Sequence, residues 1–275
     1  MKKIAVHLHL YYTEQLPQII TYLRNLTGME YDLFVTLAED NPDAIEQLKA
    51  FNPQVKIWQV ANCGYDIGPF IDFLHHINLD DYEYILKLHT KGKKSKNYTW
   101  LNGRRMDNAL WGRILWQSML ATSNQIRQNI QLLDENKKIN MLGSKYCVTD
   151  SSKDYEKLLP QINEELVKMG HPKVNKLSFV AGSMFLVRAE KMIPLLSYTL
   201  ADFVPTNSNV KEGTLAHIIE RIFGVLGQEI FLLEHGKYTL NFYWVTLKRF
   251  LYQQKQTTSG HKVIKVCKIP IYKEG

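Results

Sequence analysis

The sequence predicts an α/β protein whose central sheet is mostly parallel. Strand-like and helix-like segments alternate strictly through the first 150 residues, which is the pattern of consecutive βαβ units. At 275 residues the chain is long enough for one large domain, or for one domain with an appendage. No apolar run approaches the roughly 18–20 residues that cross a bilayer. These observations favour a single α/β domain.

The first half of the chain is expected to contain four strands joined by three helices. In the first helix Leu16, Ile19 and Leu23 recur at helical spacing. Pro69 suits the first turn of the third helix, where a missing N–H has no cost. A half-domain of this type binds nucleotides at the carboxyl ends of its strands. The predicted strands are 4–12, 32–37, 55–60 and 84–89, and the predicted helices are 13–26, 41–51 and 70–77.

The second half continues with fewer strands. A polar, lysine-rich loop at 90–97 precedes a long helical stretch. The clearest helix is 214–226, because its apolar residues form one continuous stripe. We predict strands at 139–145 and 178–187, and helices at 106–136, 153–169, 189–196 and 214–226.

The excess of positive over negative charge is confined to the C-terminal segment. Residues 236–275 contain eight lysine and arginine residues against the single acidic Glu274, a net charge of +7 that equals the excess of the whole chain. Because the remaining 235 residues are neutral, a nucleic-acid partner is not expected. The segment is also aromatic, which leaves two alternatives: a helix packed on the domain with a solvated basic end, or peripheral contact with an anionic membrane surface.

The N-terminus and the cysteines indicate the compartment. Two histidines interrupt the apolar run that follows Met1, and no small-residue cleavage site follows, so the sequence favours a strand in a cytoplasmic protein over a signal peptide. Cys63, Cys147 and Cys267 are odd in number and lack metal-ligand spacing, which excludes a disulfide scaffold and a zinc ribbon. Phosphate-binding glycine loops, a nucleophile elbow and a zinc-protease helix are also missing from the sequence.

Four loops at predicted strand ends carry the candidate chemistry. In the first, Asp66 lies between two glycines just before a helix, where it either contacts a ligand or caps the helix. In the second, Lys87, His89 and Lys91 share one face of a strand end, and Arg104 and Arg105 follow; these cations either neutralise a diphosphate or are solvated.

The other two loops lie in the second half. Gly182 and Ser183 belong to a strand of small residues, where backbone approaches a ligand or a neighbouring element. Glu212 precedes the striped helix and is either a general base or a partner of the helix dipole. His217 and Glu220 lie off the buried stripe of that helix.

Taken in order, these segments resemble the rhamnan-synthesis protein F family of bacterial polysaccharide glycosyltransferases. The matching stretches are NCGYDIGPF at 62–70, LKLHTK at 86–91, VAGSMFLVR at 180–188 and EGTLAHIIERIFG at 212–224. The resemblance covers most of residues 1–235, and the tail beyond 236 matches no family that we can name. It implies a GT-A-like, Rossmann-like domain, with a nucleotide-sugar half at 1–105 and an acceptor half at 106–235.

The resemblance also implies roles for individual residues. Glu212 corresponds to the general base of an inverting enzyme, and His217 and Glu220 lie on the acceptor side. The donor-binding residues implied by analogy are Tyr11, Tyr12, Asn62, Gly64, Tyr65, Asp66, Lys87, His89, Lys91, Arg104, Arg105, Gly182 and Ser183. The donor is a nucleotide-diphosphate sugar, with rhamnose or another deoxysugar suggested by the family name. The resemblance further implies an oligosaccharide or a lipid-linked glycan as acceptor, and a cytoplasmic protein that is either free or peripheral on the inner face of the cell membrane.

One departure from the GT-A pattern concerns metal. Many GT-A enzymes end the fourth strand with Asp-x-Asp, which holds a divalent ion on the diphosphate. This chain has His89 at that place, whereas Asp80 and Asp81 precede the strand and are expected in a turn. We therefore expect that no metal is required, with weak Mn²⁺ or Mg²⁺ binding as the remaining option, and that lysine or arginine stabilises the diphosphate. His235 is either a leftover metal ligand or structural. The same departure leaves open a non-catalytic nucleotide-sugar-binding or glycan-binding module of an assembly complex.

Overall fold

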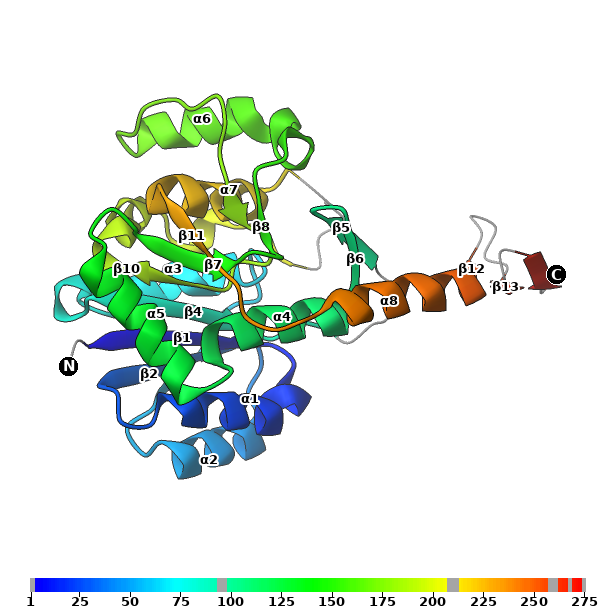
Figure 1. The fold of residues 1–275 in the computed structure, drawn as a ribbon. Coiled ribbons are helices and arrows are strands. Elements are labelled where there is room, and N and C mark those ends of the chain that lie inside the picture. The colour runs from blue at the N-terminus through cyan, green and yellow to red at the C-terminus, as the bar shows by residue number, and fades with distance from the viewer. Residues whose placement is uncertain (1–2, 93–97, 207–212, 257–261, 267–268, 274–275) are drawn as a thin grey trace. The chain divides into compact units, whose positions relative to one another are not determined.

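The computed structural model describes residues 3–92, 98–206, 213–256, 262–266 and 269–273 (Figure 1). The chain forms two compact units. The first contains residues 1–90 and 115–235, and the second contains residues 91–114 and 236–275. Each unit therefore combines segments that are distant in sequence.

A seven-stranded sheet forms the centre of the first unit. Its strand order is β11-β7-β10-β4-β1-β2-β3, and every pairing is parallel except the two that β10 makes with β4 and β7. The strands are β1 (Ile4–Leu10), β2 (Tyr31–Leu37), β3 (Lys56–Gln59), β4 (Tyr84–His89), β7 (Met141–Ser144), β10 (Phe185–Arg188) and β11 (Ile230–Leu233). The predicted α/β class with a mostly parallel sheet is confirmed.

Helices cover both faces of this sheet (Figure 1). The α3 helix contacts β1, β2 and α7, whereas α1 contacts α2, and α5 contacts the 3-10 turn that follows α1. Right-handed crossovers place α1 and α2 on one face and α3 on the other, because the order of strands reverses after β3. The helices are α1 (Leu16–Leu23), α2 (Pro42–Phe51), α3 (Ile67–His75), α5 (Ser123–Glu135), α6 (Leu159–Lys168) and α7 (Leu215–Gly227).

The core between the sheet, α3 and α7 is aromatic and tightly packed. Phe70 of α3 contacts Phe223 of α7 and Phe185 of β10 edge to face, with ring centroids 5.5 Å and 6.3 Å away. Gly224 brings α7 against the backbone, because a Cβ there would lie 1.8 Å from the Ser178 carbonyl oxygen. Only glycine permits this approach, and it places α7 directly against the backbone of residues 178–179.

Several elements differ from the sequence prediction, beginning with two helices and one strand. The predicted helix 106–136 is two helices, α4 (Asn108–Leu120) and α5, because Thr122 accepts a hydrogen bond from the Gln125 N–H and caps a new helix. The predicted strand 178–187 is two strands, β9 (Phe179–Val180) and β10, separated by a turn. The α3 helix begins at Ile67, three residues earlier than expected.

Several shorter elements complete the first unit. Where one helix was predicted at 153–169, two 3-10 turns precede α6, and the predicted helix 189–196 is a 3-10 helix with Pro194 inside it. The remaining elements are β8 (Val148–Thr149) and the 3-10 helices Thr13–Gln15, Arg24–Leu26, Leu79–Asp81, Ser152–Asp154, Glu156–Leu158, Ala189–Ser197 and Leu200–Asp202. Asp80 and Asp81 thus lie in the turn expected for them.

The second unit contains a hairpin, a helix and a small sheet. Strands β5 (Tyr98–Leu101) and β6 (Arg104–Asp107) pair across Asn102-Gly103, whose φ values of 49° and 71° are those of a tight hairpin turn. The α8 helix (Thr239–Leu251) contacts β6. It leads into an antiparallel sheet of β12 (Tyr252–Gln256), β13 (Lys262–Val266) and β14 (Ile269–Lys273). The basic, aromatic tail therefore has regular secondary structure.

No helix in the described part of the chain is both long and apolar enough to cross a membrane.

Candidate functional site

The two central strands carry polar side chains in a buried environment. Strands β1 and β4 are parallel neighbours and pair His7 with Lys87 and His9 with His89. All four side chains are buried, with Lys87 entirely inaccessible to solvent. Strands covered on both faces normally read as apolar runs. Polar groups in their place, near the carboxyl ends of the strands, mark the position where ligands bind in open α/β sheets.

Lys87 connects two loops that are distant in sequence. Its ammonium donates to Asp66 Oδ2 at 2.5 Å and to the Ser183 carbonyl oxygen at 3.1 Å. The Ser183 hydroxyl donates to the same Asp66 oxygen and lies 3.3 Å from Lys87 Nζ. Asp66 precedes α3 but makes no side-chain bond that caps it. The structure therefore does not show Asp66 capping the helix, which was one of its two interpretations.

The hydrogen bonds of His89 require its ring to be protonated and positively charged. Its Nδ1 lies 2.9 Å from the Thr90 carbonyl oxygen, and its Nε2 lies 2.8 Å from the Gly182 carbonyl oxygen. Because carbonyl oxygens only accept hydrogen bonds, both ring nitrogens must donate, and this requires the imidazolium form. Asp66 Oδ2 lies 3.7 Å from Nε2 and supplies the opposite charge. Two buried cations therefore share one carboxylate.

Electrostatics keep that carboxylate ionised. Burial raises the pKa of Asp66, but the charges of His89 and Lys87, with the hydrogen bonds from Lys87 and Ser183, outweigh burial and hold the pKa well below its usual value. Burial also lowers the pKa of Lys87, against the opposing effect of Asp66. Asp66 is consequently a permanent hydrogen-bond acceptor at neutral pH rather than a proton carrier.

The two histidines of β1 behave differently. His9 Nδ1 and His7 Nε2 both face the Thr36 hydroxyl, at 3.0 Å and 3.1 Å. Burial lowers the pKa of His9 to about 4, and burial also holds the pKa of His7 well below its usual value. Both side chains are therefore neutral at pH 7.

Both loops that meet at Lys87 contain left-handed backbone. Gly64 and Tyr65 have φ values of 67° and 57°, and Gly182 and Ser183 have φ values of 88° and 46°. Tyr65 and Ser183 are unfavourable in this conformation because they carry a Cβ. The Tyr65 N–H donates to Thr206 Oγ1 at 3.0 Å, and Ser183 is held by Asp66 and Lys87. Such strain persists only where surrounding contacts enforce it, and it concentrates at functional sites.

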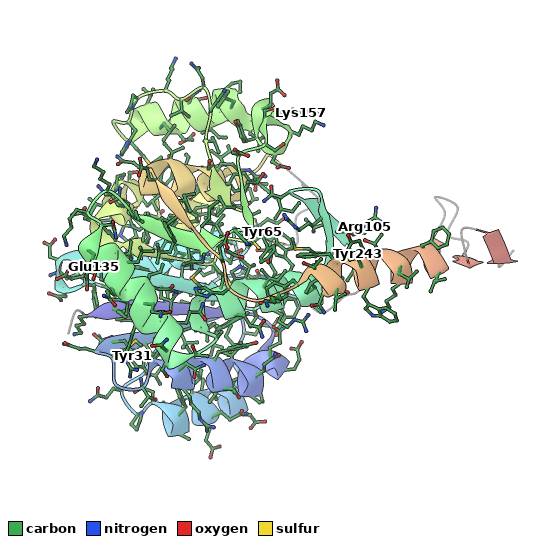
Figure 2. The ribbon with its side chains drawn as sticks, viewed as in Figure 1. Tyr31, Tyr65, Arg105, Glu135, Lys157 and Tyr243 are labelled. Atoms are coloured by element: carbon green, nitrogen blue, oxygen red, sulfur yellow. The ribbon has the colours of Figure 1, made fainter. Side chains whose placement is uncertain are left out.

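Glu212 lies outside the described residues, but its neighbours in sequence are placed. On one side Thr206 bonds the 62–65 loop, through its hydroxyl and through its N–H, which donates to the Asn62 carbonyl oxygen at 2.9 Å. On the other side Thr214 Oγ1 lies 2.7 Å from His217 Nδ1. The His217 ring contacts Tyr65 edge to face at 5.5 Å (Tyr65 is labelled in Figure 2). Residues flanking 207–212 thus contact the same loop.

Glu220, predicted on the acceptor side, contacts a predicted donor loop. Its Oε1 accepts a hydrogen bond from the Gly182 N–H at 2.9 Å, and its Oε2 accepts one from Arg221 at 2.7 Å. Arg221 also donates to the Asp154 carbonyl oxygen at 3.2 Å. The left-handed turn at Gly182-Ser183 is therefore fixed from both sides, by Lys87 with Asp66 and by Glu220.

Tyr11 and Tyr12 follow the end of β1. Their backbone N–H groups donate to Thr90 Oγ1 at 3.0 Å and 2.9 Å, and their rings meet edge to face at 4.8 Å. Tyr11 is 42% exposed and so presents an aromatic face to solvent. Thr90, Thr206 and Arg221 organise the site but were not predicted. Of these three residues, only Thr90 could have been predicted from its position, because it directly follows His89 at the end of the fourth predicted strand.

The remaining predicted cations belong to the second unit. Lys91 Nζ lies 3.8 Å from the centroid of the Trp111 ring, and the Arg104 guanidinium lies 5.8 Å from the Phe242 ring. Arg105 follows in β6, pairs with Trp100 across the hairpin and is half-buried. The structure thus brings together Asp66, Lys87, His89, Gly182, Ser183 and Glu220 of the first unit. Lys91, Arg104 and Arg105 lie in the second unit.

Among the described residues, no group of three or more histidine, cysteine or acidic residues is placed to hold a divalent metal. Asp66, the carboxylate of the cluster, is already shared by two cations, which oppose a third positive charge. Burial lowers the pKa of His235. Cys63 and Cys147 are free thiols.

The family model for rhamnan synthesis protein F matches residues 1–230 of the sequence. The chain belongs to this family. The resemblance seen in the four motifs is thereby confirmed, and each of those motifs lies within the matched residues. No curated protein sequence matches this family member.

Solved structures similar to this rhamnan synthesis protein F family member include S. aureus TarS and a mycobacterial synthase. TarS residues 1–349 align at 10% identity with a TM-score of 0.44, covering 88% of this chain and 63% of that one. The TarS complex with UDP aligns at 11% identity with a TM-score of 0.45, covering 85% and 58%. Glucosyl-3-phosphoglycerate synthase from Mycobacterium tuberculosis, bound to Mn²⁺, UDP and glucosyl-3-phosphoglycerate, aligns at 10% identity with a TM-score of 0.37, covering 99% and 90%. The chain spans less than two thirds of the length of these TarS structures.

Proposed function

We propose that this protein is a glycosyltransferase that moves a sugar from a nucleoside diphosphate donor to a growing polysaccharide. Membership in the rhamnan synthesis protein F family supports polysaccharide synthesis. The observation that carries the proposal is the cluster of Asp66, Lys87, His89 and Ser183 at the carboxyl ends of the central strands. This is where an open α/β sheet binds a nucleotide, and a cation-rich cluster there favours an anionic ligand.

On the donor side, the proposal assigns contact residues and positioning residues separately. Tyr11, Tyr12 and the 62–66 loop would contact the nucleoside, where exposed aromatic faces and an ionised Asp66 suit a base and hydroxyl groups. Lys87 and His89 already bond Asp66 and backbone carbonyls. We assign these two a positioning role, in which they hold the loops and contribute positive potential.

The leaving diphosphate needs cations that reach it directly. Lys91, Arg104 and Arg105 are the candidates that the family resemblance suggests, because side-chain cations can stabilise such a leaving group. We propose that they serve in place of a divalent metal, with weak Mn²⁺ or Mg²⁺ binding as the alternative. The cation-paired Asp66 supports this assignment, since a carboxylate so neutralised is a poor metal ligand.

Glu212 is the proposed general base of an inverting displacement. The acceptor hydroxyl loses its proton to Glu212 while its oxygen forms a bond to the anomeric carbon, and the bond to the diphosphate oxygen breaks on the opposite side. The hydrogen bonds and ring contacts of Thr206 and His217 to the 62–65 loop support this role, because they hold both ends of the segment containing Glu212. His217 would line the acceptor side. The acceptor is proposed to be an oligosaccharide or lipid-linked glycan, and the donor to carry rhamnose or another deoxysugar.

The first test is a thermal-shift screen of the purified protein against nucleoside diphosphate sugars, each with Mn²⁺ and with chelator. A ligand at 100 times its dissociation constant stabilises the protein by about 2.7 kcal/mol, which gives a measurable shift. We expect one donor to stabilise the protein equally under both conditions. A donor that stabilises only with Mn²⁺ would overturn the metal assignment.

The second test is transfer by the Glu212→Gln variant, with exposed Glu229→Gln as the matched control. We expect Glu212→Gln to lose transfer by at least about 100-fold while it keeps donor binding, because only the proton acceptor is removed. The control should behave as wild type. If wild type binds a donor but transfers nothing to any acceptor, the protein is instead a binding module of an assembly complex. Loss of donor binding in Glu212→Gln would assign Glu212 to the donor site.

A further inference from the structure

The α8 helix carries apolar residues on two opposite faces. One face is buried in the second unit, where Phe242 and Val245 are 9% and 5% exposed. Arg104 of β6 lies over the Phe242 ring, and the Arg113 guanidinium lies 6.0 Å from the ring of Tyr238, which directly precedes the helix. These contacts account for one face of the helix and leave the other to be explained.

The opposite face is exposed. Leu240 is 82% exposed, Tyr243 71% and Trp244 62%, values that are unusual for large apolar side chains in one helix. At about 100° per residue, the exposed apolar residues fall within an arc of roughly 120°, which is the width of a typical buried face. Tyr243 is labelled on α8 in Figure 2. The exposed apolar residues of the helix are Leu240, Tyr243, Trp244, Leu247, Phe250 and Leu251.

The charges around this face have one sign. No charged residue occurs from Thr239 through Leu247, and Lys248 flanks the exposed arc one turn after Trp244. Residues 236–275 carry eight basic residues and one acidic residue, whereas the rest of the chain is neutral. The partner of this face must therefore accept apolar and aromatic side chains and carry negative charge.

We propose that the exposed face of α8 docks on an anionic lipid surface. Tryptophan and tyrosine favour the membrane–water interface because one end of each is apolar and the other is polar. At 13 residues the helix is too short to cross a bilayer and suits an orientation in the plane of the interface. Lysine near the apolar arc can direct its charge toward lipid headgroups.

A second copy of the chain fits this face less well. Association through α8 would bring together two segments that each carry a net charge of +7, and like charges oppose such contact. The helix is also shorter than the three to four heptads that a coiled coil usually needs. The lipid proposal is independent of glycosyl transfer, since it rests on α8 and on the charge of residues 236–275.

The test is co-sedimentation of the full chain with vesicles of phosphatidylcholine, with and without phosphatidylglycerol. We expect binding only when phosphatidylglycerol is present, and less binding as salt increases. Tyr243→Ser/Trp244→Ser should reduce the partition coefficient about tenfold or more, because two interfacial side chains are lost. Lys248→Gln should reduce it about fivefold.

The matched control is Phe231→Ser/Leu232→Ser on β11, which removes apolar side chains that are 40% and 47% exposed in the first unit. This variant should bind vesicles as wild type does. Thermal unfolding of each variant establishes that it is folded. The proposal fails if wild type binds neither kind of vesicle, or if the control loses binding equally. It also fails if wild type is a dimer that the α8 variant converts to a monomer.

Discussion

The two units of this protein depart from ordinary folding rules in opposite ways. The first buries charge: Lys87 and His89 lie inside the sheet with Asp66 beside them. The second exposes apolar surface along α8, where Leu240 and Trp244 face solvent. Either departure costs free energy in an isolated molecule, because buried ions lose hydration and exposed apolar groups order water. On the proposals made above, the buried charge holds the donor loops of the first unit, and the exposed face of α8 is a docking surface of the second.

Removal of Lys87 should break the buried cluster and give the largest effect. Lys87→Met leaves Asp66 without its closest cation, and we expect the free energy of unfolding to fall by about 3–5 kcal/mol. Chemical denaturation measures it. Lys168→Met is the control, because Lys168 is an exposed lysine that pairs with Glu164 and Glu165. Its effect on the free energy of unfolding should be much smaller. Asp66→Asn should restore part of the loss in Lys87→Met; an unchanged double variant would contradict the cluster as the cause.

Acidification should destabilise the first unit through its neutral histidines. The pKa of His9 is about 4 in the folded protein and near 6.5 when unfolded, so only the unfolded state takes up a proton between these values. Stability should therefore fall as the pH decreases from about 6.5 to about 4, by about 3 kcal/mol from His9. Denaturation midpoints at pH 7 and pH 5 measure the slope. His9→Gln should flatten it, and an equal slope in that variant would exclude His9 as the source.

Glycine substitutions compare the packing of the two units. In α7, Gly224→Ala would place a Cβ 1.8 Å from the Ser178 carbonyl oxygen, and we expect a loss of about 1–3 kcal/mol. In α4, the Cβ of Gly112→Ala would meet Lys91 Cβ at 3.4 Å among the described residues, and the variant should gain about 0.5–1 kcal/mol from helix propensity. Thermal unfolding of both variants measures the difference. Equal effects of one sign would show that the local packing does not decide the outcome.

Substitutions on the exposed face of α8 should have the smallest effect on folding. Because Tyr243 and Trp244 are mostly exposed, Tyr243→Ser/Trp244→Ser should change the free energy of unfolding by less than about 1 kcal/mol. Its vesicle partition coefficient should nevertheless fall about tenfold or more. A large loss of stability would mean that the face packs against the protein itself.

Periodicity predicted the elements that form the first unit. Strands β1, β2 and β4 and helix α7 appear within two residues of their predicted bounds, because each has a strong apolar pattern of its own. Motif spacing also singled out Asp66, Lys87, His89 and Ser183. What it did not reveal is their pairing, since Asp66 and Ser183 are 117 residues apart and no local pattern joins them.

The sequence prediction missed two features, a break in one strand and a hairpin. The strand predicted at 178–187 breaks because Gly182 and Ser183 adopt positive φ, which the cluster enforces from outside the segment. The hairpin of β5 and β6 was not predicted, since residues 98–105 were left between the loop at 90–97 and the helix predicted from 106. Asn102-Gly103 was the available signal, since this dipeptide favours a tight hairpin turn.

The two segments of the second unit are synthesised at different times. Residues 91–114 leave the ribosome about 120 residues before residues 236–275, with which they form one compact unit. At about 5–20 residues per second, the hairpin and the start of α4 wait on the order of 6–24 seconds for α8. Over that interval the first unit can complete its sheet. A nascent chain stalled just after His235 would therefore present the β5–β6 hairpin without its helix, as a natural site for chaperone or protease.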